Sequence, residues 1–139
     1  MATGPIFTPQ QLSDGGNALI YVYRPSRFTN AAGAPEITVD GVRKGSLKNG
    51  GYLAIEVKPG EHSVVQVYSY ITWALKAEPI LIKAEPKKEY FIILDINGSV
   101  ESLGATPSGG IYMINKSAYF HEVEVSVGLS GIRELKQSN

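Results

Sequence analysis

The sequence predicts an all-β domain, an antiparallel β-sandwich of about eight short strands. Short apolar runs recur along the chain, and several alternate apolar with polar residues, which is the period of a half-buried strand. Turn-forming pairs separate these runs, and Asp40-Gly41 and Asn49-Gly50 are typical of tight hairpins. Only the C-terminus offers a short helix, so the pattern of alternating β and α units is not expected.

The first predicted strand is the run ALIYVY at 18–23, which Arg24-Pro25 ends because proline cannot continue a strand ladder. Further strands are predicted at 36–40, 42–47, 52–57, 62–70, 79–84, 90–96, 111–114 and 120–127. Their alternation places in the core Ile37, Val39, Leu53, Ile55, Val65, Val67, Ile92, Leu94, Val123 and Val125.

The second half of the chain is the less regular one. The run 90–96 is apolar on both faces, which is typical of a central strand. The Gly-rich stretch 102–110 is expected to be a loop, and 128–137 either forms a short helix or frays. Whether residues 71–78 pair in a sheet stays open at this point.

Length and composition predict one domain. The chain has 139 residues, a common domain size, and no cysteine, so disulfides and thiolate metal sites are excluded. Residues 1–17 are rich in Pro, Gly, Gln and Ser, and we expect a flexible lead-in or tether. Residues 18–139 are expected to form the single sandwich domain.

The charge balance argues against several partners. Thirteen basic and thirteen acidic residues give a net charge of zero, without the basic excess that nucleic-acid binding requires. No run approaches the roughly 20 apolar residues of a membrane helix, so no transmembrane span is expected. A net charge of zero gives little electrostatic repulsion between copies of the chain, so the formation of a homo-oligomer is compatible with the sequence.

Three runs carry a resemblance to a known family: ALIYVYRPSRF, EITVDGVRKGSL and NGGYLAIEVKPGEHSV. Between Ala18 and His62 their order resembles the bacterial domain of unknown function DUF2846, with looser agreement to about Val127. The Gly-Tyr strand start and Pro-Gly-x-His turn are also similar to PEGA-type modules, small β domains of bacterial surface proteins.

The resemblance implies a periplasmic or outer-membrane-associated protein. Many members of the family begin with a lipoprotein signal, which implies a lipid anchor in a native precursor. This chain has neither a lipobox nor a cysteine, and residues 1–17 are compatible with the spacer left after such a signal. Because the family has no established activity, the resemblance supplies no catalytic residues.

The residues themselves predict no catalytic or metal site and no cofactor. His62 and His121 are the only histidines, and zinc needs three or four converging ligands. No Gly-x-Ser-x-Gly motif is present. Asp40 is better explained as a turn residue, and Glu122 and Glu124 would face solvent together. Ser108-Gly109-Gly110 leads into a strand, whereas a phosphate-binding loop leads into a helix.

Aromatic residues are the best binding candidates. Tyr21 and Tyr23 share one face of a strand, and Tyr68 and Tyr70 share a face of another, with Trp73 just beyond. Exposed rings can stack on sugars or anchor a protein partner. Alternatively, each pair covers a second small core, which is the commoner fate of strand aromatics.

The function predicted from these observations is a non-enzymatic protein-interaction module of the bacterial envelope, acting through a sheet edge or the aromatic patch. The alternative is a carbohydrate- or peptidoglycan-binding domain that uses the same rings, and an unrecognised enzyme ranks below both. Sugar sites usually add a polar fringe to their rings. Near Trp73 the sequence offers only Gln66, Ser69 and Thr72.

Overall fold

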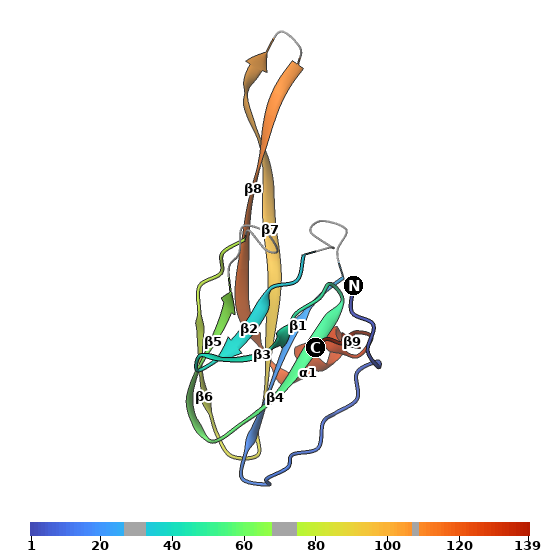
Figure 1. Ribbon diagram of the computed structural model, residues 1–139, viewed down its shortest axis with the longest axis vertical. Helices are drawn as coiled ribbons and strands as arrows, with labels where there is room; N and C mark the ends of the chain where they lie inside the picture. Colours follow the sequence, from blue (N-terminus) through green and yellow to red (C-terminus); the bar gives the residue numbers. More distant parts are fainter. Residues whose placement is uncertain (27–32, 68–74, 107–108) are drawn as a thin grey trace.

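The computed structural model describes residues 1–26, 33–67, 75–106 and 109–139, with only the backbone described from 96 to 117 (Figure 1). The strands are β1 (Ala18–Arg24), β2 (Glu36–Val39), β3 (Val42–Ser46), β4 (Gly51–Val57), β5 (Gly60–Val67), β6 (Ile80–Ala84), β7 (Glu89–Thr106), β8 (Gly109–Val123) and β9 (Lys136–Gln137). One short helix, α1 (Val125–Ile132), lies between β8 and β9. The all-β class is therefore confirmed.

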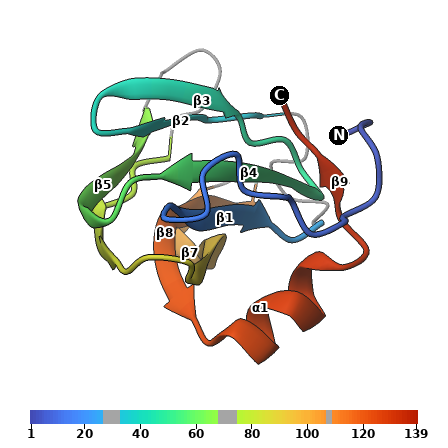
Figure 2. The same cartoon turned by 90° about the horizontal axis from the view of Figure 1, so that it is seen from below.

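The strands form two sheets that face each other (Figure 2). Sheet A has five strands in the order β8-β7-β1-β4-β9, and sheet B has four in the order β3-β2-β5-β6. At eight residues, α1 is too short to cross a bilayer, and no other helix in the described ranges could do so.

The predicted strand direction is wrong for two pairs in sheet A. β1 pairs with β7 in parallel, and β4 pairs with β9 in parallel. After β4 the chain builds β5 and β6 in sheet B and then re-enters sheet A beside β1, and such a crossover is what a parallel pair requires. The alternation of apolar and polar residues in a strand indicates which side chains face the core, but it does not indicate the direction of the neighbouring strand.

The Asp40-Gly41 hairpin turn is confirmed by its backbone angles, whereas the predicted hairpin at Asn49-Gly50 is wrong, because this turn connects β3 of sheet B to β4 of sheet A. Asp40 and Gly41 both have positive φ, 52° and 82°, as a two-residue turn between β2 and β3 needs. Gly50, before β4, has a φ of 68°. Glycine and aspartate tolerate this conformation, so these turns follow directly from the sequence.

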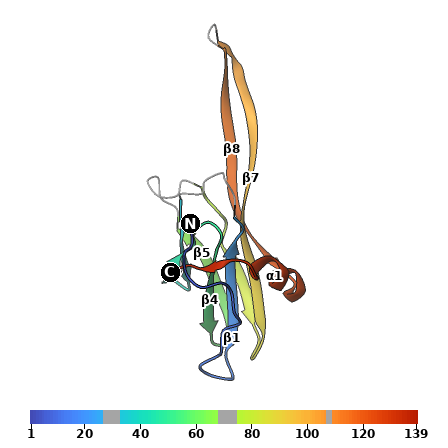
Figure 3. The ribbon, with the colours of Figure 1, turned by 90° about the vertical axis from the view of Figure 1, so that its right-hand side faces the viewer.

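The hairpin of β7 and β8 is much longer than predicted. The two strands have 18 and 15 residues, and they pair from Phe91–Val123 out to Thr106–Gly109. The stretch 102–110, expected to be a loop, is mostly strand, although 107–108 lie outside the described residues. β1 contacts β7 only as far as Ile93, and the hairpin beyond it projects from the body of the sandwich (Figures 1 and 3). We call residues 97–106 and 109–117 the distal ribbon.

Aliphatic residues fill the space between the sheets. This inner core contains Ala18, Ile20, Val22, Ile37, Val39, Leu47, Leu53, Ile55, Val57, Val64, Ile82, Ala84, Ile92, Leu94 and Ala118, all at most 7% exposed. Strand β1 contributes every second residue to it, as expected for a period of two. Six of the ten predicted core residues are here: Ile37, Val39, Leu53, Ile55, Ile92 and Leu94.

The predicted orientation of β5 is wrong. Val67 is 39% exposed and Val65 is not part of the inner core, whereas Val64 and Gln66 are buried. Val64 is the register partner of inward-facing Val39, and Gln66 is the partner of inward-facing Ile37. Paired residues share a face of the sheet, so the pairing with β2 turns the glutamine inward.

A second cluster covers the opposite face of sheet A. This outer cluster contains Leu19, Tyr21, Tyr23, Tyr52, Phe91 and Ile132. Phe7 packs against this cluster, and its ring lies edge-on to two others. The distance between ring centroids is 5.3 Å to Tyr21 and 5.2 Å to Tyr52. The ring of Tyr21 also stacks on that of Phe91 at 5.0 Å.

The N-terminal segment lies along the sheet that carries the outer cluster. Backbone bonds join Gly4 N to Gln137 O and Phe7 N to Leu135 O, at 3.2 and 2.9 Å. Further along, the Ser13 amide and hydroxyl both donate to the Glu56 carboxylate of β4. These bonds from Ser13, with one from the Asn17 amide, lower the pKa of Glu56 to about 2. The lead-in thus makes regular contacts from one end of the sheet to the other.

The strand predicted at 120–127 ends earlier than expected. β8 ends at Val123 and α1 begins at Val125, so Val125 and Val127 are exposed helix residues instead of core strand residues. The valines at 123, 125 and 127 alternate with other residues as in a strand, which is why the sequence predicts a strand there. The helix docks through Gly128, where a Cβ would overlap the ring of Phe91. Ile132 is buried on that side, as predicted for a terminal helix.

Candidate functional site

The described residues contain no group of three or more His, Asp or Glu side chains that could hold a metal ion. The two histidines lie on different sheets, His62 on β5 and His121 on β8. His121 is exposed on β8. A hydroxyl meets a carboxylate at Ser13 and Glu56, in an exposed contact that joins the lead-in to β4.

The five aromatic candidates fall into two groups. Tyr68, Tyr70 and Trp73 lie outside the described residues. Tyr21 and Tyr23 are 0% and 2% exposed, so they do not form a binding face. They belong to the outer cluster, because β1 is a central strand whose two faces are both covered. Burial raises the pKa of both phenols, and the Tyr21 hydroxyl accepts a bond from the Gln10 amide at 3.0 Å.

Arg24, in the Tyr-x-Tyr-Arg-Pro run, has a structural environment. It is 1% exposed and donates from Nη1 to the carbonyl oxygens of Gly33 and Leu47. Burial lowers the pKa of its guanidinium to about 10. The side chain therefore ties the end of β1 to two connecting segments, which explains an arginine at this point without any ligand.

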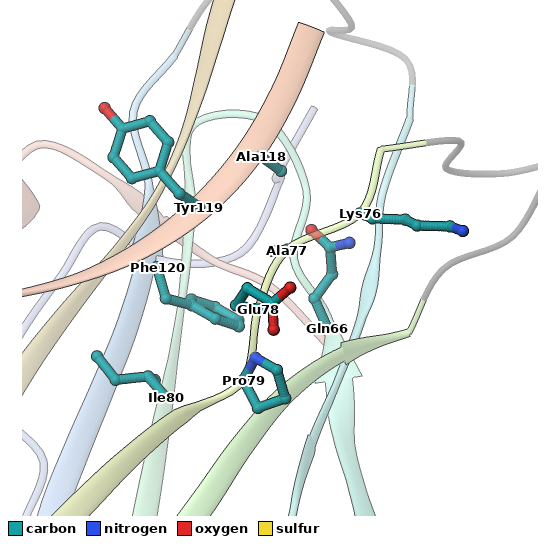
Figure 4. A pocket seen from close by; sticks show the side chains of 9 residues that line it. All are labelled: Gln66, Lys76, Ala77, Glu78, Pro79, Ile80, Ala118, Tyr119 and Phe120. Carbon is teal, nitrogen blue, oxygen red and sulfur yellow. The ribbon is translucent and has the colours of Figure 1, made fainter.

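A cavity of about 580 Å³ opens between the facing edges of the two sheets (Figure 4). Three segments form it: Gln66 of β5, residues 76–80 leading into β6, and, far from both in the sequence, residues 118–120 of β8. β6 and β8 are the edge strands of sheets B and A, and the cavity marks where the sandwich is not closed by strand pairing. Its size is typical of pockets for small ligands or anchoring side chains.

The cavity walls are mainly apolar with a polar mouth. Phe120 and Ile80 are half-buried and pack on the inner core. Lys76 and Glu78 are exposed side chains on the segment that leads into β6. The Tyr119 ring points away from the cavity in Figure 4, and its hydroxyl donates to Asp95 at 3.4 Å. The aromatic ring available inside is therefore Phe120 alone among the described residues.

Gln66 is the polar group at the inner end of the cavity. It is 4% exposed, and its Nε2 donates to the carbonyl oxygen of Leu75 at 2.6 Å. Its Oε1 has no hydrogen-bond partner among the described residues. A buried acceptor without a partner costs about 1–3 kcal/mol, so such groups are few in folded proteins and call for an explanation.

From the sequence, Gln66 is predicted only as one of the polar residues near Trp73, and not as a site residue. The signal that could have found it is a glutamine in the middle of the valine run Ser63–Val67, where polar residues are uncommon. The cavity as a whole could not be found, because residues 118–120 of β8 meet Gln66 and residues 76–80 of sheet B only through the packing of the two sheets.

β8 also presents a free edge. It is the outermost strand of sheet A, and β7 is its one partner among the described strands. The backbone groups on its other side are available for pairing with an added strand. Its 15 residues contain no proline, the residue with which natural proteins often protect an edge.

A pair of polar residues, His62 and Asp40, lies in sheet B, at the start of β5 and just after β2. His62 Nδ1 contacts Asp40 Oδ2 at 2.5 Å, and His62 Nε2 contacts the Lys58 carbonyl oxygen at 2.6 Å. Burial opposes the charged imidazole, but these two bonds outweigh it and raise the pKa of His62. The His62 bond and one from the Ser63 amide lower the pKa of Asp40. The pair joins the turn between β2 and β3 to the start of β5.

Comparison with known proteins gives one match. The model of DUF2846, a family of proteins of unknown function, matches residues 14–110, more than half of the chain. That range runs from the start of β1 into the β7–β8 hairpin. No curated protein and no solved structure matches the chain significantly.

Proposed function

Because the chain belongs to the DUF2846 family, whose function is unknown, its role has to be inferred from its geometry. We propose that it is a non-enzymatic protein-interaction module that takes up a partner strand along the free edge of β8. The observation that carries this proposal is the long free edge of β8, which no other described strand covers. Strand addition to such an edge is a common way to recognise a peptide segment.

The distal ribbon supports the same proposal. Beyond Ile93 the strand β7 pairs with β8 alone, so two strands extend from the body without a third strand in the described ranges. An isolated two-stranded hairpin is only marginally stable in water. A partner that adds a strand to the ribbon would bury its exposed backbone groups and stabilise it.

The envelope location is part of the proposal and is supported by the family resemblance. Fractionation of cells that produce the native protein tests it, with recovery in the periplasmic or outer-membrane fraction as the expected result. Recovery in the cytoplasmic fraction would contradict the location without touching strand addition, because the geometry of β8 does not depend on the compartment.

The experiment that tests the interaction uses a shortened ribbon. Residues 98–116 are replaced by Asn-Gly, so that Asn97 and Ser117, which are register partners, flank a two-residue turn. All described members of the inner core lie outside the removed segment, so the variant should keep its fold. Full-length chain and variant are each used to capture protein from envelope extract.

We expect the full-length chain to recover one protein in near-stoichiometric amount, and the shortened variant to bind it at least roughly tenfold more weakly. Equal capture by both chains would contradict a role for the ribbon. A captured protein that proves to be a second copy of this chain, confirmed by sedimentation of the purified protein, would make β8 a homo-oligomer interface.

Carbohydrate or peptidoglycan binding is the second candidate. The observation in its favour is that Gln66, Lys76 and Glu78 line the cavity together with Phe120, which supplies the polar fringe that sugar sites usually have. Glycan recovered without protein from the same extract, and equally by the shortened variant, would favour this function over strand addition.

A further inference from the structure

We propose that the cavity between the sheet edges receives a tyrosine or tryptophan side chain of the partner strand, with its O–H or N–H donated to Gln66 Oε1. This inference builds on the proposed strand addition to β8. It names the anchor residue of the partner and the group that recognises it.

The cavity and the edge are continuous. Residues 118–120 of β8 form one wall of the cavity, and the same residues belong to the free edge along which the partner strand would lie. In an added strand, alternate side chains point to the same face of the sheet. A partner residue opposite this part of β8 would therefore direct its side chain toward the space between the sheets.

The chemistry of the cavity selects the anchor. Its walls, which include Phe120, Ile80 and Pro79, favour an apolar body. The buried Gln66 Oε1, drawn in Figure 4 on the side of Ala118, accepts a hydrogen bond but cannot donate one. Tyrosine and tryptophan combine a large apolar ring with a single donor, whereas phenylalanine and leucine would leave the acceptor without a partner.

Other residue types fit less well. A lysine or arginine would bring a charge into a mainly apolar space, which is costly without a buried counter-ion. Serine and asparagine have donors but would fill little of a cavity of about 580 Å³. Tyrosine and tryptophan are also the residues that most often anchor protein interfaces.

The test uses amino-acid probes and does not need the partner. Acetylated amides of tyrosine, tryptophan and phenylalanine are titrated at millimolar concentration into the full chain, and amide chemical shifts report binding. We expect the shifts to concentrate at Gln66, Ile80 and Phe120. The tyrosine and tryptophan probes should bind roughly three- to tenfold more tightly than the phenylalanine probe, the difference that one neutral hydrogen bond makes.

Three variants separate the causes. Gln66→Met keeps the side-chain volume and removes the acceptor, so the preference for the donor-bearing probes should vanish while an apolar preference remains. Ala77→Leu, on the segment that leads into β6, fills the cavity and should weaken all three probes. Gln11→Met makes the same substitution at an exposed position and should change nothing.

Equal affinity of the three probes in the unmodified chain would overturn the role of Gln66, and absence of shifts at the cavity would overturn the anchor site. Neither outcome bears on the shortened-ribbon experiment. If the probes behave as expected but the shortened ribbon binds its partner normally, the cavity is an anchor site and strand addition along the distal ribbon is wrong.

Discussion

The inner core and the outer cluster lie on opposite faces of the same strands but are built differently. The inner core is aliphatic and is closed by a second sheet. The outer cluster is largely aromatic and is closed by two terminal segments, the lead-in with Phe7 and the helix α1. Strand β1 contributes to both, with Ile20 pointing to one and Tyr21 to the other.

This difference shows which part of the fold local pattern can specify. Strands that close the inner core carry their own alternation and hairpin turns. The segments that close the outer cluster contribute few large apolar residues each, such as Phe7 and Ile132. Their docking depends on the surface already made by sheet A, so we expect the outer cluster to be the weaker of the two.

The largest effect is expected in the inner core. Ile20→Ala removes a completely buried side chain from the central strand and leaves a cavity that the two sheets cannot close. The free energy of unfolding should fall by about 3 kcal/mol. Urea denaturation followed by circular dichroism measures it, with Leu81→Ala on the exposed face of β6 as the control, which should cost less than about 0.5 kcal/mol. A decrease in the free energy of unfolding as small as that of the control would show that the inner core is not the main source of stability.

A smaller but specific effect is expected where α1 meets the outer cluster. In Gly128→Ala the new Cβ would overlap the ring of Phe91, so helix and sheet must move apart. Overpacking of this kind costs about 1–3 kcal/mol, more than the gain of about 1 kcal/mol for alanine in a helix.

Gly131→Ala is the matched control for that variant. Its Cβ would meet the Tyr23 hydroxyl at 3.0 Å, a tight contact but not the overlap that Gly128 would have with Phe91, so the net change should be less than about 1 kcal/mol. The same denaturation experiment compares the two. If both glycines tolerate alanine equally, α1 does not depend on close contact with Phe91.

The next effect concerns the lead-in. Phe7→Ala removes two edge-on ring contacts from a half-buried residue and should cost about 1–2 kcal/mol. Hydrogen exchange should accelerate at the Phe7 amide, which donates to Leu135 O, while the amides of β1 stay protected. Thr8→Ala, one residue further and exposed, is the control. Uniform acceleration throughout the chain would mean that the two clusters unfold together.

The sequence was sufficient for what local chemistry decides. Asp40-Gly41 predicts its hairpin because positive φ is needed at both residues, and the alternation of β1 predicts its inner face. It was insufficient where distant segments decide. The parallel partner of β1 depends on a crossover, and the extent of the β7–β8 hairpin depends on pairing between two long strands, not on the glycines at 104 and 109–110.

The candidate site was missed for a related reason. One face of β5 carries Val65 and Val67, and the other carries Val64 and Gln66. Because glutamine is polar, the sequence predicts that the face with Val65 and Val67 is buried, which is wrong. Pairing with β2 overrides that preference and buries Gln66 at the cavity. Positions where local rules and tertiary structure disagree are often functional, which is why this glutamine is a better candidate than the tyrosines of β1.

The smallest effect tests a contact outside both clusters, the pair of His62 and Asp40. Both ring nitrogens of His62 face acceptors, so the protonated imidazolium satisfies both contacts. The folded state therefore raises the pKa of His62 above its ordinary value of about 6.5. Stabilisation by a raised pKa is complete below the unfolded value and is lost as the pH rises through the folded value.

Asp40 limits the same contact at low pH. Its pKa is lowered, so its contribution is present above an ordinary value of about 3.9 and is lost as the pH falls through the folded value. Between about pH 4 and 6.5 the charged form of each group therefore predominates in the folded state. The difference in unfolding free energy between the natural chain and His62→Gln should be larger at about pH 5.5 than at about pH 8.5. Because the Asp40 side chain is 49% exposed, solvent screening should keep this change below about 1 kcal/mol. Asp40→Asn should remove most of the pH dependence, and a difference that stays constant with pH would show that His62 acts as a neutral ring.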